Sequence, residues 1–199
     1  MERIYLDHAA TSPTDPRVVE KMLPYLTENF GNPSSIHSFG RESRKWLDST
    51  RELIAQEIGA HPNEIVFTSG GTEADNMAIL GSALAREKQG RHIITTKIEH
   101  HAVLHTCNRL EEMGFDVTYL DVDESGRISA EQVKDALRDD TILVTVMYGN
   151  NEVGTIQPID EIGDLLKDHP ALFHTDAVQA FGFLPIDVQK SRIDMMSVS

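Results

Sequence analysis

The sequence has 199 residues, 40% of them hydrophobic and 25% charged, a composition that is ordinary for a soluble globular domain and excludes wholesale disorder. Its 18 basic and 32 acidic side chains give a formal net charge of −14, which disfavours binding driven by contacts with nucleic-acid phosphates. The single cysteine excludes an internal disulfide, and no apolar run approaches the ~18 residues of a membrane span. The first residues also have no apolar signal core. Together these features lead us to expect a cytoplasmic protein.

The chain alternates predicted strands and helices from about residue 40 onward. After an irregular segment at 31–35 that is rich in proline, glycine and serine, apolar residues at helical spacing predict a helix at 40–58. Strands are expected at 64–68, 91–96, 117–121, 141–148, 171–175 and 194–199. Helices are expected at 72–86, 102–113, 129–138 and 158–167. This alternation predicts βαβ units and a largely parallel α/β sheet.

Ligands of parallel sheets bind at the carboxyl ends of strands, so the residues there are the first candidates for a site. The segment 68–73 (TSGGTE) follows the first predicted strand. Its glycines allow close approach of the backbone, and the next helix offers free N–H groups that suit a phosphate. A plain turn capped by Thr72 is the alternative. Neither the P-loop pattern nor the GxGxxG fingerprint is present, which argues against those nucleotide-binding classes.

Three histidines follow the second predicted strand. His101 and His105 are four residues apart on one helix face and could ligate zinc together with His100, although the HExxH pattern is absent. A single imidazole directed into a cleft, as an aromatic platform or a proton carrier, is the better functional interpretation.

Two further strand ends carry polar residues, each with two interpretations. Asn150 and Asn151 are flanked by glycines, which is typical of a turn, but their amides could also bond a ligand hydroxyl. Asp176 follows apolar strand residues and should be partly buried. It is either the N-cap of a following helix or a buried anion that faces a cationic ligand nitrogen.

Together these segments resemble the cysteine desulfurases of the class V aminotransferase group, in particular their NifS/IscS-like branch. The resemblance covers essentially the whole chain and rests on 5–11 (YLDHAAT, like the family's opening strand), 30–37 (FGNPSSIH), 68–73 (TSGGTE), 99–104 (EHHAVL), 150–158 (NNEVGTIQP) and 176–179 (DAVQ). It implies fold type I of the pyridoxal-phosphate enzymes. Residues 16–199 would be a large domain with three α/β/α layers, incomplete at its C-terminal side, and residues 1–15 would pack with a small domain outside this chain.

The resemblance also implies how the cofactor, pyridoxal 5′-phosphate (PLP), is held. Gly71 and Thr72 would bind its phosphate at the start of a helix, and Ser199 would be a further phosphate ligand. Asp176 would pair with the protonated pyridine nitrogen, which makes the ring a better acceptor of electrons.

Three more residues receive roles from the resemblance. His100 would stack on the pyridine ring and assist proton transfer, and is the expected catalytic residue of this chain. Asn151 would lie near the phenolic oxygen of the ring, and Gln179 would bond the same hydroxyl group.

The implied reaction removes sulfur from L-cysteine and leaves alanine and a persulfide on an enzyme cysteine. A sulfur acceptor is expected as partner, either an iron–sulfur scaffold or a tRNA-thiolation enzyme, and so is a homodimer. Direct nucleic-acid binding and membrane binding are not expected. The Schiff-base lysine would lie three residues beyond Ser199 and the nucleophilic cysteine further on, so this chain alone is expected to be inactive. Cys107 matches neither role and is expected to be a packed or partly exposed thiol.

Other interpretations remain open. The nearest is another PLP enzyme of fold type I, such as a selenocysteine lyase, an aminotransferase or a kynureninase-like enzyme. The others are a non-catalytic binding protein of the same fold, and a zinc hydrolase built on the three histidines.

Overall fold

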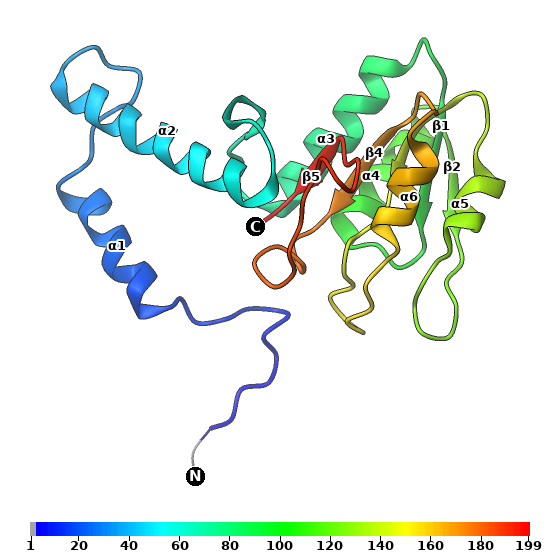
Figure 1. Ribbon diagram of the computed structural model, residues 1–199, viewed down its shortest axis with the longest axis horizontal. Coiled ribbons are helices and arrows are strands. Elements are labelled where there is room, and N and C mark those ends of the chain that lie inside the picture. Colours follow the sequence, from blue (N-terminus) through cyan, green and yellow to red (C-terminus); the bar gives the residue numbers. More distant parts are fainter. Residues whose placement is uncertain (1–2) are drawn as a thin grey trace. The chain divides into compact units, whose positions relative to one another are not determined.

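The computed structural model describes residues 3–199, which fall into two compact units that divide between Val66 and Phe67 (Figure 1). This division lies at a different place from the boundary expected after residue 15. The expected packing of residues 1–15 with a further domain stays a prediction.

The first unit contains two α-helices with few buried side chains, followed by a short 3₁₀ helix. α1 (Pro16–Thr27) is capped by the Asp15 side chain, and its leading proline costs no hydrogen bond in the first turn. α2 (Ser38–Ile58) confirms the helix predicted there and ends at Gly59, whose φ of 72° favours glycine. The sequence pattern does not predict α1, because Pro24 lies inside it and normally ends a helix.

The strand predicted at 64–68 is wrong. Pro62–Glu64 form a short 3₁₀ helix, η1, closed by the Glu64 carboxylate, which accepts the His61 N–H at 2.7 Å. The backbone is then extended at Ile65, with φ −85° and ψ 124°, but no strand among residues 3–199 pairs with it. A strand exists only where a neighbour completes its hydrogen bonds, and for the same reason 5–11 is not a strand either.

The second unit is built on a five-stranded sheet in which every pairing is parallel, with the order β2-β1-β3-β4-β5. The strands are β1 (His92–Thr96), β2 (Asp116–Leu120), β3 (Thr141–Thr145), β4 (Leu172–Asp176) and β5 (Met195–Ser197). They confirm the five strands predicted from residue 91 onward and the parallel sheet. β1 and β3 are buried along their whole length, as expected for strands covered on both faces.

The hydrogen bonding between β3 and β4 continues beyond Thr145, the last residue of β3. β3 ends at Thr145 rather than at 148, yet the N–H groups of Val146 and Tyr148 donate to the carbonyls of His174 and Asp176 at 3.1 and 2.8 Å. The segment after β3 therefore lies directly beside the end of β4.

Four helices cover the sheet: α3 (Gly71–Arg86), α4 (His101–Glu112), α5 (Ala130–Ala136) and α6 (Ile159–Leu166). α3 packs against α4 and β3 to β5, whereas α5 packs against α6 and β2. In Figure 1, α5 and α6 lie in front of the strands and α3 and α4 behind them, which gives the expected three layers. Among residues 3–199 no helix combines the length and the apolar character that a bilayer crossing requires.

The main core lies between the α3–α4 layer and the sheet. Its fully buried members include Ile79 from α3, Ile93 from β1, Leu110 from α4 and Leu143 from β3. Cys107 belongs to this core and is 0% exposed, and burial raises the pKa of its thiol to about 12. It is therefore a packed thiol.

Candidate active site

Parallel strands end at one edge of a sheet, and four of them deliver polar segments there. β1 leads to His100, β3 to Asn150, β4 to Asp176 and β5 to Ser199. The starts of α3 and α4 complete the surroundings. Such an edge is where α/β proteins bind ligands.

The start of α3 lies against the segments that follow β4 and β5. A Cβ atom on Gly71 would lie 2.9 Å from Cγ2 of Val178 and 3.8 Å from Cβ of Ser199, so the close approach requires glycine. No side chain caps the helix, and Thr72 lies within its first turn, so the alternative of a plain turn capped by Thr72 is wrong. The first N–H groups of α3 are left without a cap, and such groups suit an anion.

Asp176 is the last residue of β4 and is 6% exposed. Its Oδ1 accepts the Val178 N–H at 3.0 Å. Burial raises the pKa of this carboxyl, while the Val178 N–H and nearby His100 act in the opposite direction. A turn follows at 177–180, and no helix follows up to Ser199, so the N-cap alternative is wrong and the buried anion remains.

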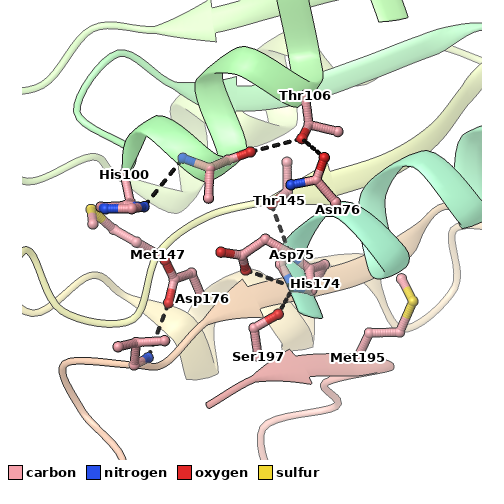
Figure 2. Close-up of polar contacts among 12 residues, drawn as sticks. Asp75, Asn76, His100, Thr106, Thr145, Met147, His174, Asp176, Met195 and Ser197 are labelled. Atoms are coloured by element: carbon pink, nitrogen blue, oxygen red, sulfur yellow. Dashed lines mark hydrogen bonds and ion pairs between the residues drawn. The ribbon is translucent and has the colours of Figure 1, made fainter. Parts of the chain in front are cut away.

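His100 lies directly before α4 and caps that helix, because its Nδ1 accepts the Ala102 N–H at 3.2 Å. Its ring remains exposed. One ring nitrogen of His100 and one carboxylate oxygen each of Asp75 and Asp176 lie within 4.8 Å of one another (Figure 2). The imidazole and the carboxylate predicted for one site are thus brought together.

The zinc alternative built on three histidines is wrong. In the described part of the chain, the acidic and imidazole groups close enough to share a metal ion are Asp75, His100 and Asp176, and the histidine trio is not among such groups. His101 and His105 instead stack on the exposed side of α4, with ring centroids 5.4 Å apart.

A hollow of about 370 Å³ opens between the starts of α3 and α4. Thr72 and His100 both line it. Asn76 also lines it and fixes its two walls: its amide donates to the Thr72 carbonyl at 2.7 Å, and its Oδ1 accepts the Thr106 hydroxyl at 2.8 Å. Thr72, one of the residues predicted for the phosphate, and His100, predicted for the ring face, therefore share this hollow, whereas Gly71, Asp176 and Ser199 are not among the residues that line it.

A buried polar cluster that the sequence did not indicate lies beside Asp176 (Figure 2). Asp75 Oδ1 lies 3.7 Å from His174 Nε2, and the two side chains are 1% and 0% exposed. The same Nε2 lies 3.0 Å from Ser197 Oγ, and Nδ1 lies 2.9 Å from Thr145 Oγ1. Burial lowers the pKa of His174 to about 3, so this imidazole is neutral.

Glu99 is a second buried acid that sequence reasoning missed. Its Oε1 accepts the Thr96 hydroxyl at 2.7 Å and the Met147 N–H at 3.0 Å, which ties the end of β1 to the segment after β3. Burial raises the pKa of Glu99 to about 8. This acid fixes the backbone directly before His100.

The two neighbouring asparagines differ in their surroundings. Asn150 is buried, its Oδ1 accepts the N–H groups of Glu152 and Val153 at 2.8 and 2.9 Å, and its amide donates to the Ile98 carbonyl at 3.1 Å. It therefore builds the turn. Asn151 is half-buried in that turn, and Gln179 is half-buried in the turn after Asp176. Their contacts with a ring hydroxyl stay predictions.

Comparison with known proteins extends the picture to the whole chain. The family described as Aminotransferase class-V matches residues 4–199. The chain is 76% identical over its full length to the Bacillus subtilis (strain 168) protein named "Putative cysteine desulfurase IscS 1", and 57% identical over 98% of its length to "Cysteine desulfurase IscS" of Methanosarcina thermophila. It covers 52% and 48% of those two proteins, so the chain spans about half the length of the curated relatives it matches.

Solved structures agree over nearly all of the chain. "SspA in complex with cysteine" superimposes with a TM-score of 0.95 at 47% identity, and covers 98% of this chain and 56% of its own. "NIFS-LIKE PROTEIN" superimposes with a TM-score of 0.96 at 41% identity, and covers 100% of this chain and 55% of its own.

Proposed function

We propose that this chain, which belongs to the aminotransferase class-V family, is the cofactor-binding part of a PLP-dependent cysteine desulfurase of the NifS/IscS type. The observation that carries the proposal is the convergence at one sheet edge of an uncapped helix start and a buried carboxylate. Gly71 and Asp176 are linked there through Val178, which contacts the glycine and donates its N–H to the carboxylate.

The residues present fit PLP at both of its ends. Gly71 and Thr72 would hold the phosphate with the first N–H groups of α3, and Ser199 lies close enough to Gly71 to add a hydroxyl. Asp176 would face the ring nitrogen, since a buried carboxylate is stabilised by a cationic partner. PLP, when bound, supplies an electron-withdrawing ring that stabilises negative charge at the α-carbon of an amino acid.

Three side chains around the ring complete the proposed site. His100 would lie against the ring face and carry a proton at the imidazole nitrogen that does not accept the Ala102 N–H. Asn151 and Gln179 would bond the hydroxyl group of the ring. Glu99 holds the segment before His100 in place.

The proposed substrate is L-cysteine, with alanine as product and a persulfide on an enzyme cysteine that passes its sulfur to an acceptor. The names of the relatives and a related structure solved with cysteine support this substrate. The acceptor would be an iron–sulfur scaffold or a tRNA-thiolation enzyme, and the enzyme would act as a homodimer in the cytoplasm.

The test uses the full-length protein that contains this chain. The wild type is expected to bind PLP and to release alanine from L-cysteine, with matching sulfide when a thiol reductant is present. Asp176→Asn should lower turnover roughly 100-fold or more, because it removes one partner of a buried charge pair. Asp139→Asn, a matched change at an exposed position, should not. Alanine release that is absent in the wild type, or unchanged in D176N, would contradict the proposal.

A further inference from the structure

Asp75 joins the two ends of the proposed cofactor site. It is the fifth residue of α3, one turn after Gly71, so it belongs to the same helix as the proposed phosphate ligands. Its carboxylate lies 3.7 Å from His174 of β4, and the Ser197 hydroxyl of β5 is close enough to hydrogen-bond with it and to lower its pKa. One buried side chain therefore connects the start of α3 to the strand that carries Asp176.

Two buried carboxylates share a small volume here. An oxygen of Asp75 lies within 4.8 Å of one of Asp176, and the residues are 1% and 6% exposed. Two anions this close, away from water, repel each other strongly, so one of the two is favoured in its protonated form. Within residues 3–199, no lysine or arginine forms an ion pair with either carboxylate.

The surroundings decide which acid keeps the proton. Asp176 accepts the Val178 N–H and has His100 beside it, and both stabilise its anion. Asp75 has one hydroxyl, that of Ser197, to favour its anion, and its Oδ1 makes no hydrogen bond to the described residues. His100 lies beside both acids, and the other titratable neighbours of Asp75 are Asp176, Glu99 and the neutral His174. Asp75 is also the more deeply buried of the two, at 1% exposed against 6%. The anion is therefore better placed on Asp176 and the proton on Asp75.

We infer that Asp75 is a positioning residue: it holds the proton that the two acids share, leaves Asp176 as the anion for the cofactor, and fixes the start of α3 relative to β4. The identity of that cofactor rests on the proposed function. The protonation of Asp75, by contrast, is a property of the cofactor-free protein.

The neighbouring hydrogen bonds accommodate a neutral acid. A protonated Asp75 can donate to Ser197 Oγ, and the Ser197 hydroxyl can donate to His174 Nε2 at 3.0 Å. His174 then carries its proton on Nδ1 and donates to Thr145 Oγ1 at 2.9 Å (Figure 2). Each side chain in this series acts as a donor to the next, and no buried charge is required.

The experiment compares three variants of the full-length protein in its cofactor-free form. Asp75→Asn keeps the shape and removes the acid, Asp75→Ala removes the side chain, and Asp139→Asn is the exposed control. Infrared difference spectra at about pH 6 report protonated carboxyl groups, since a raised pKa keeps such a group protonated there. D75N is expected to lose one protonated-carboxyl band, which D139N retains. A buried Glu99 carboxyl contributes a separate band that D75N also retains.

Cofactor affinity, measured by titration of PLP into the same proteins, supplies the second readout. D75N should bind within about threefold of the wild type and D75A at least about tenfold more weakly, because the amide preserves the neutral contacts that alanine loses. An unchanged infrared band in D75N, or an affinity loss in D75N as large as in D75A, would overturn the inference. Should D75A fail to fold, D75N alone decides through its band. Failure of the wild type to bind PLP would instead defeat the proposed function and leave the infrared result intact.

Discussion

Gly71→Ala should weaken cofactor binding through a contact that can be specified in advance. The new Cβ atom would lie 2.9 Å from Cγ2 of Val178, closer than side-chain carbons approach each other. Valine is stiff at χ1, so it relieves this contact by moving its backbone rather than by rotating. The N–H of that backbone is the one that holds Asp176 at 3.0 Å. One added methyl group therefore disturbs the phosphate end and the ring end together.

The magnitude follows from the cost of overpacking. Extra methyl groups in a packed region cost about 1–3 kcal/mol, which corresponds to roughly 5- to 150-fold in an equilibrium constant. We expect the dissociation constant of PLP from the full-length G71A protein to rise within this range. Titration of the cofactor-free protein, followed by the fluorescence or absorbance of bound PLP, measures it.

Two further variants make the reasoning refutable. Val178→Ala removes the opposing Cγ2 atom, so the double variant should recover most of the affinity that G71A loses. Gly81→Ala, in the same helix but with open space around its Cβ position, should leave PLP affinity unchanged and stabilise the fold by about 0.5–1 kcal/mol. The argument fails if G71A binds PLP as the wild type does, or if V178A does not restore it.

Three further expectations follow from burial and from the family resemblance. In the folded protein the pKa values of Asp75 and Glu99 are raised to about 7 and about 8, so these carboxyls keep protons that the unfolded chain has already released. The free energy of unfolding should therefore fall as pH rises, which denaturant titrations of the cofactor-free protein can measure. The fall should be clearest from about pH 7 to 8, where His174 has lost most of its proton in the unfolded chain as well and no longer opposes it, and Glu99→Gln should flatten it. A rise over that window would contradict the assignment. Because its thiol is buried, Cys107 should be alkylated at least about 100-fold more slowly in the folded than in the unfolded protein, as measured by peptide mass spectrometry. Rapid labelling of the folded protein would contradict this and would show that this part of the core opens. The 199-residue chain alone should give no steady turnover with L-cysteine and PLP, because the resemblance places the lysine and the nucleophilic cysteine outside it; sustained release of alanine would refute this.

The sheet was predictable where its strands carry their own signal. β1 and β3 are apolar runs buried on both faces, and such runs are recognisable without knowing their neighbours. The segment 64–68 has a similar composition, yet whether it becomes a strand depends on a partner that the local sequence does not specify.

The residues proposed to contact the cofactor could be picked out from the sequence, whereas the buried residues behind them could not. Asp176 stands out because an acid directly after an apolar run must be buried. Nothing local marks Asp75 as buried, since it lies among polar residues in the first turns of a helix. Two spacings give a hint: Asp75 is four residues after Gly71, and His174 is two residues before Asp176, so each shares a face with a predicted ligand.

The roles of the two neighbouring asparagines also could not be predicted from the local sequence. Asn150 and Asn151 are adjacent and identical in type, but only the contacts made in three dimensions reveal that Asn150 builds the turn. Its hydrogen bond to Ile98 links positions 52 residues apart in the chain. Local sequence carries no information on such a pairing.

The place of β4 in the sheet determines how firmly Asp176, the acid proposed to face the ring, is held. β4 is hydrogen-bonded to β3 on one side and to β5 on the other, so the position of the carboxylate at its end is restrained by both neighbouring strands. The proposed contact between the Asp176 carboxylate and the single ring nitrogen of PLP tolerates little error in the position of the carboxylate. A phosphate has several equivalent oxygens and can be satisfied by a helix start that moves slightly. The contact that tolerates least error in the proposed site is thus built on a strand paired on both sides, and the more adaptable one on the start of a helix.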